Sequence, residues 1–282
     1  MEVLSEHRCF EGVQGFYRHD SRVIGLPMRF CVYRPPQAAE RVVPVLFYLA
    51  GLTCSEETFA IKAGAQMRAA QLGLMLVSCD TSPRNTGIAG EATDWEFGAG
   101  AGFYVNATQD PWARHFRMYD YVLDELRETV LANFPARPDR LGIFGHSMGG
   151  HGALVLALRN PQVYKSVSAF APICSPMRCG WGQKALPRFL GSDRSAWGAY
   201  DAVELMTASA RAAYPEILID QGLADKFMSQ SQLLPELFEA ACAKSGQTLR
   251  LRRHAGYDHG YYFISTFIGD HLQFHAATLN AT

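Results

Sequence analysis

The chain has 282 residues, of which 48% are hydrophobic, and its formal net charge is −1. This length and apolar content suffice for a large core, and because α/β folds of this size often form one domain, we expect a single domain over residues 1–282. The balanced charge offers no attraction for nucleic acid or an anionic membrane, and no apolar run is long enough to span a bilayer.

The cysteines and the first residues of the chain indicate the cellular compartment in which the protein is expected. The seven cysteines are an odd, widely spaced set, and the closest two, Cys174 and Cys179, do not have the spacing of a usual zinc site. Residues 1–7 lack a basic segment and an apolar segment, so we expect no signal peptide. These features favour a cytoplasmic protein with free thiols, and nothing in the sequence calls for a metal or another cofactor.

Strand-like and helix-like segments alternate along the first half of the chain. Short apolar runs predict strands, and an apolar period of 3.6 residues predicts helices. The expected strands are Met28–Tyr33, Val42–Leu49, Leu74–Ser78 and Leu141–Phe144, and the expected helices are Ala60–Leu72, His115–Asn133 and residues 150–158. The intervening Thr81–Pro111 is rich in Gly, Asp, Asn and Thr, and so long a loop in a compact domain is usually functional.

The alternation continues in the second half of the chain. The expected strands are Ser166–Ala171, Glu216–Asp220 and Gln247–Arg253, and the expected helices are Ser229–Lys244 and Tyr261–Ala276. Ser175–Trp197 reads as an irregular, cap-like insertion. Such alternation predicts an α/β fold with a mainly parallel central sheet and helices on both faces. In these sheets the functional residues lie at the carboxyl ends of the strands.

One strand end carries the pattern G-x-S-x-G. Gly145-His146-Ser147-Met148-Gly149 follows an expected strand and precedes an expected helix, which is the setting of a nucleophile elbow. The turn holds its serine in a strained conformation, so the neighbouring positions must be small. A serine needs a base, which is normally a histidine oriented by a carboxylate, and in an α/β-hydrolase the chain order is Ser, acid, His.

The acid and the base are expected after the later strands. Asp220 and Asp225 both follow the strand that ends near residue 219, and topology alone prefers Asp225 without excluding Asp220, since aspartates are common in turns. His259 lies in the last loop before the closing helix, whereas its competitor His254 ends a strand and is expected at the surface. His146 and His151 flank the serine and are interpreted as packing residues. His271 and His275 have the spacing of a metal pair, but no third ligand is near them.

Two amides are expected to form an oxyanion hole. Met148, directly after the serine, supplies one amide, and Leu52, in the loop after Val42–Leu49, supplies the other. Cys54 lies in the same loop as a near-site thiol, with a buried structural cysteine as the equal alternative. Lys62 and Lys184 are candidates for a positive rim, although solvated surface lysines are the commoner case.

Taken together, these motifs resemble the S-formylglutathione hydrolase (esterase D) family over nearly the whole chain. The resemblance implies an α/β-hydrolase fold with Ser147, Asp225 and His259 as the triad, which selects Asp225 over Asp220. Asn106, Gly180 and Leu186 depart from the family's usual residues. The segments that carry the resemblance are 51–54, 94–108, 145–154, 181–185, 220–225 and 256–263.

The resemblance also implies the reaction. The expected activity is hydrolysis of S-formylglutathione to glutathione and formate, a step of formaldehyde detoxification, by a possible homodimer. A carboxylesterase for short acyl esters is the alternative, and a hydrolase-fold binding protein without activity is a third hypothesis. In similar proteins a cysteine at the position of Cys54 makes the enzyme sensitive to thiol reagents.

Overall fold

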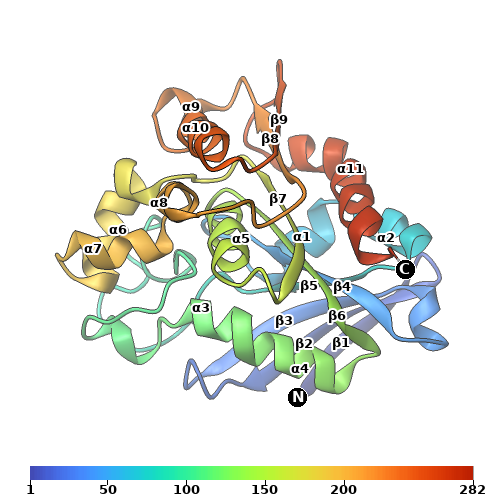
Figure 1. Ribbon diagram of the computed structural model, residues 1–282. Helices are drawn as coiled ribbons and strands as arrows, with labels where there is room; N and C mark the ends of the chain where they lie inside the picture. The colour runs from blue at the N-terminus through green and yellow to red at the C-terminus, as the bar shows by residue number, and fades with distance from the viewer. Residues whose placement is uncertain (282) are drawn as a thin grey trace.

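The structure, a computed structural model, describes residues 1–281. Its strands form one nine-stranded sheet in the order β1-β2-β3-β5-β4-β6-β7-β8-β9, and Figure 1 labels each of these strands. The strands are β1 (Glu2–Cys9), β2 (Gly12–Asp20), β3 (Pro27–Arg34), β4 (Val43–Leu49), β5 (Met75–Cys79), β6 (Ala136–His146), β7 (Tyr164–Phe170), β8 (Ile217–Gly222) and β9 (Leu249–His254).

The predicted fold class is confirmed. The six strands β5, β4, β6, β7, β8 and β9 pair in parallel, while β1, β2 and β3 add an antiparallel edge next to β5. The sequence pattern did not predict β1 and β2. Because almost all of β1 is exposed, its sequence lacks the apolar alternation by which a half-buried strand is recognised.

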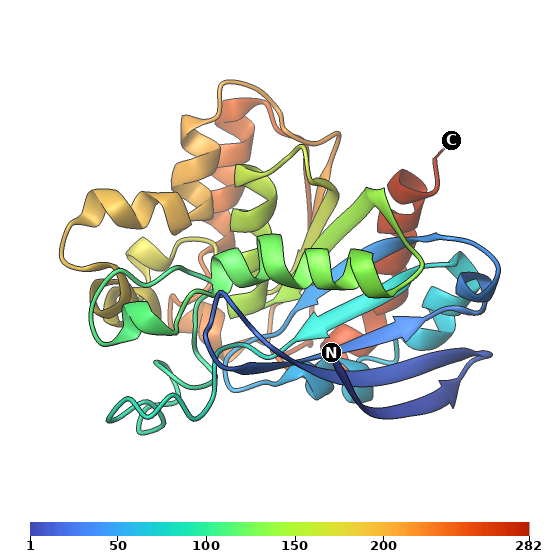
Figure 2. The same ribbon diagram turned by 90° about the horizontal axis from the view of Figure 1, so that it is seen from below.

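Helices cover both faces of the sheet, as Figures 1 and 2 show. One face carries α11, which packs on α2 and β7, together with α1; the other carries α5, which packs on β6 and β7 beneath α8. The helices of the first face are α1 (Glu56–Lys62), α2 (Gln66–Leu72) and α11 (Tyr261–Leu279). Those of the second face are α4 (Arg127–Asn133), α5 (Met148–Arg159), α8 (Ala202–Ala208) and α10 (Pro235–Ser245).

Two expected helices have other bounds in the structure. The expected helix Ala60–Leu72 is α1 and α2, because Gly64 between them takes a left-handed φ of 67° that ends the first helix. The expected helix Ser229–Lys244 starts only at Pro235, as α10, and the short α9 (Lys226–Ser229) ends where it was expected to begin. Proline suits the first turn of a helix, where no backbone donor is needed.

Two further segments differ from expectation. The segment Ser175–Trp197, expected to be irregular, contains α6 (Gly180–Leu190) and α7 (Arg194–Trp197), with Pro187 inside α6. The expected helix His115–Asn133 starts only at Met118 and includes a π-helical stretch before α4. The first difference comes from composition, because glycine and proline in α6 obscured an amphipathic pattern.

The centre of the molecule is built from β4 and α5. Every residue of β4 is buried, and residues 148–157 of α5 are buried as well, because this helix lies between the sheet and α8. The carboxyl ends of β4 and β6, beside the start of α5, therefore lie at this buried centre. Among residues 1–281, no helix combines the length and the apolar character that crossing a membrane requires.

Candidate active site

Ser147 lies on a sharp turn between β6 and α5, as the motif predicts. Its backbone has a φ of 57° and a ψ of −119°, a strained conformation for a residue with a side chain. A methyl group on Gly145 would lie 2.2 Å from the Gly149 carbonyl oxygen, and one on Gly149 would lie 1.9 Å from the Leu49 carbonyl oxygen. The tight contact between helix and strand therefore excludes any side chain at these positions.

Asp225 and His259 form a direct pair. Asp225 is buried, and its Oδ2 lies 2.5 Å from Nδ1 of His259, while its Oδ1 accepts a hydrogen bond of 2.8 Å from the Phe227 amide at the start of α9. The Gln221 side chain donates a longer bond of 3.3 Å to Oδ2. Because a carboxylate only accepts, Nδ1 of His259 donates, and in the neutral ring Nε2 is then the nitrogen that can accept a proton.

The loops after β8 and β9 bring this pair together. The Leu223 amide donates to the His254 carbonyl and the Ala224 amide donates to the Tyr257 carbonyl, each at 2.9 Å. A methyl group on Gly222 would lie 2.4 Å from the Tyr257 carbonyl oxygen, so only glycine permits this approach. Two segments that are distant in sequence are thus joined through backbone contacts.

His146 connects the pair to the Ser147 turn. Its ring lies 4.4 Å, centre to centre, from the ring of His259, and it directly precedes Ser147. Within residues 1–281, no hydrogen bond joins the Ser147 hydroxyl to His259, and neither ring nitrogen of His146 has a protein partner. Burial is the larger cause, and the nearby His259 the smaller one, of the low pKa of His146, which lies well below its usual range. This ring is therefore neutral at pH 7.

The other flanking histidine has a packing role. His151 is completely buried, and its Nε2 lies 3.0 Å from the Phe103 carbonyl oxygen, to which it donates. Burial lowers the pKa of His151 to about 4. The interpretation of His151 as a packing residue agrees with this contact.

The amides of Leu52 and Met148 are available to a ligand. Among the described residues, neither amide forms a hydrogen bond, although the amides of Thr53 and Cys54 are both bonded. Gly51 places the Leu52 loop against the serine turn, since a methyl group on Gly51 would lie 3.2 Å from Cβ of Ser147. Two unpaired donors thus come from adjacent segments, as an oxyanion hole requires.

Cys54 is a partly exposed thiol beside these donors. Burial raises the pKa of Cys54 above its ordinary value, although contacts with Thr58 and Tyr261 partly offset this effect. A cavity of about 480 Å³ next to it is lined by Lys62, Tyr261, Tyr262 and Ser265. The Lys62 ammonium lies 5.9 Å from the centre of the Tyr261 ring.

An aromatic wall, formed by Trp95, Trp181 and Phe227, borders His259. The Phe227 ring stands edge-on to His259 at 4.8 Å and to Trp181 at 4.8 Å, and Trp95 lies 5.7 Å from Trp181. Lys184, a candidate for the positive rim, is neutralised here by Asp94 and Glu96 at 2.6 and 2.7 Å. Of the two candidate lysines, only Lys62 lacks a carboxylate partner among residues 1–281.

The competing acid lies in a different network. Asp220 is fully buried and forms a two-pronged ion pair with Arg252, both distances being 2.6 Å. Burial raises the pKa of Asp220, but contacts with His271 and Arg252 lower it by more, so it lies well below its usual range. Nε2 of His254 is 3.3 Å from the same carboxylate, so the expectation that His254 lies at the surface is wrong.

The histidines with metal-like spacing bind serines. His271 contacts Ser168, and His275 bridges Ser166 and Ser168, at distances of 2.7 to 2.8 Å. Within residues 1–281 no cluster of three His, Cys, Asp or Glu side chains is suited to a metal ion. The spacing of the two histidines therefore serves packing between α11 and β7.

Sequence reasoning missed the residues behind the Leu52 loop. Thr81 and Arg84 both donate to the Cys54 carbonyl, at 2.7 and 2.9 Å. The available signal was Asp80-Thr81-Ser82, a polar run directly after β5 at the same edge of the sheet as Ser147.

Comparisons with known proteins agree on one family. A family model described as putative esterase matches residues 21–274. The chain is 52% identical over 281 residues to S-formylglutathione hydrolase of Mus musculus and 50% identical over 285 residues to that of Bos taurus, and each match covers 100% of this chain and 99% of the relative. A solved structure of an S-formylglutathione hydrolase from Agrobacterium tumefaciens superposes with a TM-score of 0.96 at 47% identity, covering 99% of this chain and 100% of that one.

Proposed function

The chain belongs to the S-formylglutathione hydrolase family of hydrolase enzymes, and from this premise we propose that it hydrolyses S-formylglutathione to glutathione and formate with Ser147, His259 and Asp225. The observation that carries the residue assignment is the 2.5 Å contact between Asp225 and His259, next to the strained Ser147 turn. The proposed physiological role is removal of formaldehyde that has been trapped as the thioester.

The first half of the proposed reaction acylates the enzyme. Ser147 Oγ attacks the formyl carbon while Nε2 of His259 takes the hydroxyl proton, and Asp225 stabilises the imidazolium that forms. The negative charge that develops on the carbonyl oxygen is held by the amides of Leu52 and Met148. The C–S bond then breaks, and the glutathione thiolate leaves with the proton from His259.

The second half releases the acid. Water attacks the formyl ester on Ser147 and gives a proton to His259, and the tetrahedral oxyanion returns to the same two amides. The C–O bond to Ser147 breaks, His259 protonates Ser147 Oγ, and formic acid leaves and loses its proton to water to give formate. A thiolate is a good leaving group, so protonation matters less in the first half than it does for an amide.

The test is formate release from S-formylglutathione by the purified protein. The Ser147→Ala variant should lose activity by orders of magnitude, about 10⁶-fold in kcat if the three residues act as a unit. Ser195→Ala, which alters an exposed serine of α7, is the matched control and should keep full activity. Near-normal turnover by the Ser147→Ala variant would refute the mechanism.

The match to the esterase model favours a second candidate, a carboxylesterase for short acyl esters on the same residues. Comparing kcat/KM for S-formylglutathione and for a short acyl ester distinguishes the two. A higher value for the thioester supports the first proposal, and a higher value for the ester replaces it.

We propose that the enzyme acts in the cytoplasm, because its seven cysteines are all thiols, which is typical of a reducing compartment. We also propose a homodimer, on the family resemblance and on the commonness of two-fold pairs. Light scattering on the purified protein decides the second point, since a mass near 31 kDa would mean a monomer.

A further inference from the structure

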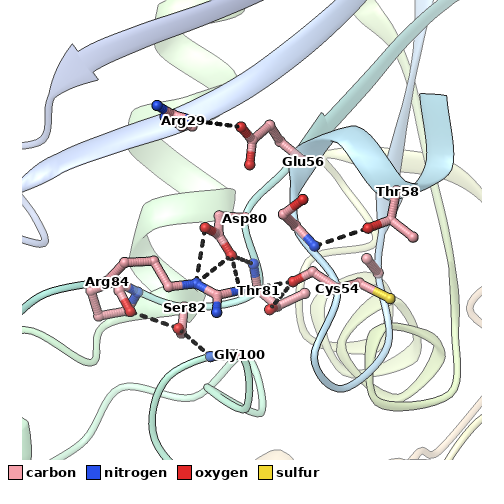
Figure 3. A network of polar contacts seen from close by, with 12 residues as sticks. Arg29, Cys54, Glu56, Thr58, Asp80, Thr81, Ser82, Arg84 and Gly100 are labelled. Atoms are coloured by element: carbon pink, nitrogen blue, oxygen red, sulfur yellow. Dashed lines mark hydrogen bonds and ion pairs between the residues drawn. The ribbon is translucent and has the colours of Figure 1, made fainter. Parts of the chain in front are cut away.

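We propose that Thr81, Arg84 and Asp80 position the oxyanion hole by clamping the oxyanion loop, residues 51–55, from its outer side. This inference rests on the proposed function, because it takes the Leu52 amide as a donor to the oxyanion. Figure 3 shows these three residues, with the Cys54 carbonyl that they hold, at the end of β5. None of the three is part of the proposed triad, so they are positioning residues.

The clamp acts on one atom of the loop, the carbonyl oxygen of Cys54. Thr81 Oγ1 donates to it at 2.7 Å and Arg84 Nη2 donates to it at 2.9 Å. Thr81 is completely buried, so its hydroxyl cannot turn to water instead. Two donors of fixed direction on one carbonyl define the orientation of the Cys54–Ser55 peptide plane.

Asp80 holds the Arg84 guanidinium in place. Nε of Arg84 lies 3.1 Å from both carboxylate oxygens of Asp80, and Nη2 lies 2.7 Å from Oδ1. Asp80 is buried and also accepts the Thr81 amide at 2.7 Å, so its carboxylate is itself fixed to the end of β5. The planar guanidinium of Arg84, held in this way by Asp80, loses little conformational entropy when it donates to the Cys54 carbonyl. A lysine ammonium would act only as a point charge without this fixed geometry.

The remaining backbone donors of the loop are also bound, except near the serine. The Thr53 amide donates to the Gly100 carbonyl at 2.8 Å, and the Gly100 amide in turn donates to Ser82 Oγ at 2.8 Å. The Ser55 amide donates to Thr58 Oγ1 at 3.1 Å. Within residues 1–281 the Leu52 amide has no such bond, so the contacts restrain the loop from outside while this donor stays free for the substrate.

The loop needs external restraint because its conformation is strained. Thr53, a β-branched residue next to Leu52, has a φ of 69°, which is rare for any residue other than glycine. A strained residue of this kind persists only when its surroundings hold it. Without the clamp, relaxation at Thr53 would turn the Leu52 amide away from the position where the oxyanion forms.

The expected consequence is a loss in kcat with little change in KM. The Leu52 amide bonds a charge that develops only in the transition state, so a misplaced amide lowers the rate of the chemical step without weakening the binding of substrate. A displacement of about 1 Å in a catalytic group lowers rates by about 10- to 100-fold.

The experiment compares four variants by kcat per active site, which is counted by titration with a fluorophosphonate. Thr81→Val and Arg84→Met each remove one donor and should lower kcat about 10- to 100-fold at nearly unchanged KM. Thr81→Ser keeps the hydroxyl and should restore at least a third of wild-type kcat. The control Arg137→Met removes an arginine that pairs with Asp139 at 2.7 Å, at the opposite end of β6 from Ser147, and should keep wild-type kcat.

A second readout separates positioning from a general loss of structure. The affinity of a boronic acid, whose tetrahedral adduct places an oxygen in the oxyanion hole, should fall in parallel with kcat/KM. A variant that is merely less stable would show fewer titratable sites but normal kcat and normal boronate affinity at those sites, and this result would overturn the inference.

An activated acetate ester serves as substrate alongside S-formylglutathione, because any ester hydrolysis on Ser147 uses the same oxyanion hole. If the wild type cleaves only the ester, the proposed substrate is wrong and the clamp is still tested. If the wild type cleaves the thioester and both Thr81→Val and Arg84→Met keep wild-type kcat per site, the clamp is wrong and the proposed function stands.

Discussion

Single residues decide which groups in the candidate site can react. Asp225 and Asp220 lie five positions apart, yet only Asp225 contacts His259, while Asp220 is bound to Arg252. The buried Asp220 near the end of β8 pairs with the partly exposed Arg252, and this ion pair joins β8 to β9. The order of strands and loops could not decide which of the two carboxylates orients the histidine. Their side-chain partners distinguish them, His259 for Asp225 and Arg252 for Asp220.

Cys54 should react with thiol reagents slowly at neutral pH. Because burial raises the pKa of Cys54, the reactive thiolate is scarce at pH 7, and its fraction should rise about tenfold per pH unit between about pH 6 and pH 8. We expect N-ethylmaleimide to inactivate the enzyme at a rate that follows this increase, since the adduct lies next to the Leu52 loop.

The control for this prediction is a second partly exposed cysteine. Cys9→Ser should remain as sensitive as the wild type, because Cys9 lies on the edge strand β1, whereas Cys54→Ser should resist inactivation. Inactivation of Cys54→Ser at the wild-type rate would assign the sensitivity to another thiol.

At the scale of elements, the site depends on how closely α5 approaches β4. The helix begins against the strand end at a distance that only glycine permits, and this contact keeps Ser147 in its strained turn. Met148, the proposed oxyanion donor, begins α5 directly after Ser147, so the same contact positions both residues.

Gly149→Ala should disrupt this contact. The added methyl group would lie 1.9 Å from the Leu49 carbonyl oxygen, so the helix must shift, and we expect a loss of several kcal/mol in unfolding free energy together with most of the activity. The matched control is Gly269→Ala in α11, where the methyl group meets no neighbour within 4 Å. That variant should be more stable by about 0.5–1 kcal/mol, since alanine favours a helix over glycine.

Urea unfolding curves of both variants test this pair. A Gly149→Ala protein with wild-type stability and activity would show that α5 can move away from β4 without consequence for Ser147.

The ends of the parallel strands could be predicted from the sequence. The candidate site residues that directly follow those ends were therefore expected. Ser147 and Asp225 each follow a buried apolar strand, and His259 follows the half-buried edge strand β9. Parallel strands end at one edge of a sheet, so these three residues are expected close together. The clamp could not be predicted, because the bonds from Thr81 and Arg84 to Cys54 depend on the path of the loop after β5. Likewise β1 has no apolar face, so its pairing depends on β2 and not on a pattern of its own.

On the scale of the whole molecule, buried histidines link stability to pH. His146, His151, His271 and His275 are buried, and in each case burial is the main cause that holds the pKa below its ordinary value of 6.5. His146 and His275, with pKa values well below 6.5, and His151, with a pKa of about 4, stay neutral in the folded protein but take up protons in the unfolded chain below pH 6.5. Their stabilising contribution is therefore complete above pH 6.5 and is lost as the pH falls.

We expect the unfolding free energy to decrease as the pH falls from 6.5 to 5, by up to about 1.4 kcal/mol per pH unit for each histidine. His151→Gln keeps a donor for the Phe103 carbonyl but cannot take up a proton in this range, so its unfolding free energy should fall less steeply. Urea titrations at a series of pH values measure both slopes, and equal slopes for variant and wild type would contradict the assignment to His151.

The order of the site residues along the chain has a consequence for synthesis. Ser147 follows β6 in the middle of the sheet, whereas the Asp225 loop is held by the Tyr257 carbonyl, which the ribosome adds only after β9. Because domains generally fold as units, a nascent chain that ends before β9 lacks the backbone contact that holds the Asp225 loop. We expect such a chain, which has the proposed nucleophile Ser147 without the proposed base His259, to be inert toward thioesters until its last strand and helix join the sheet.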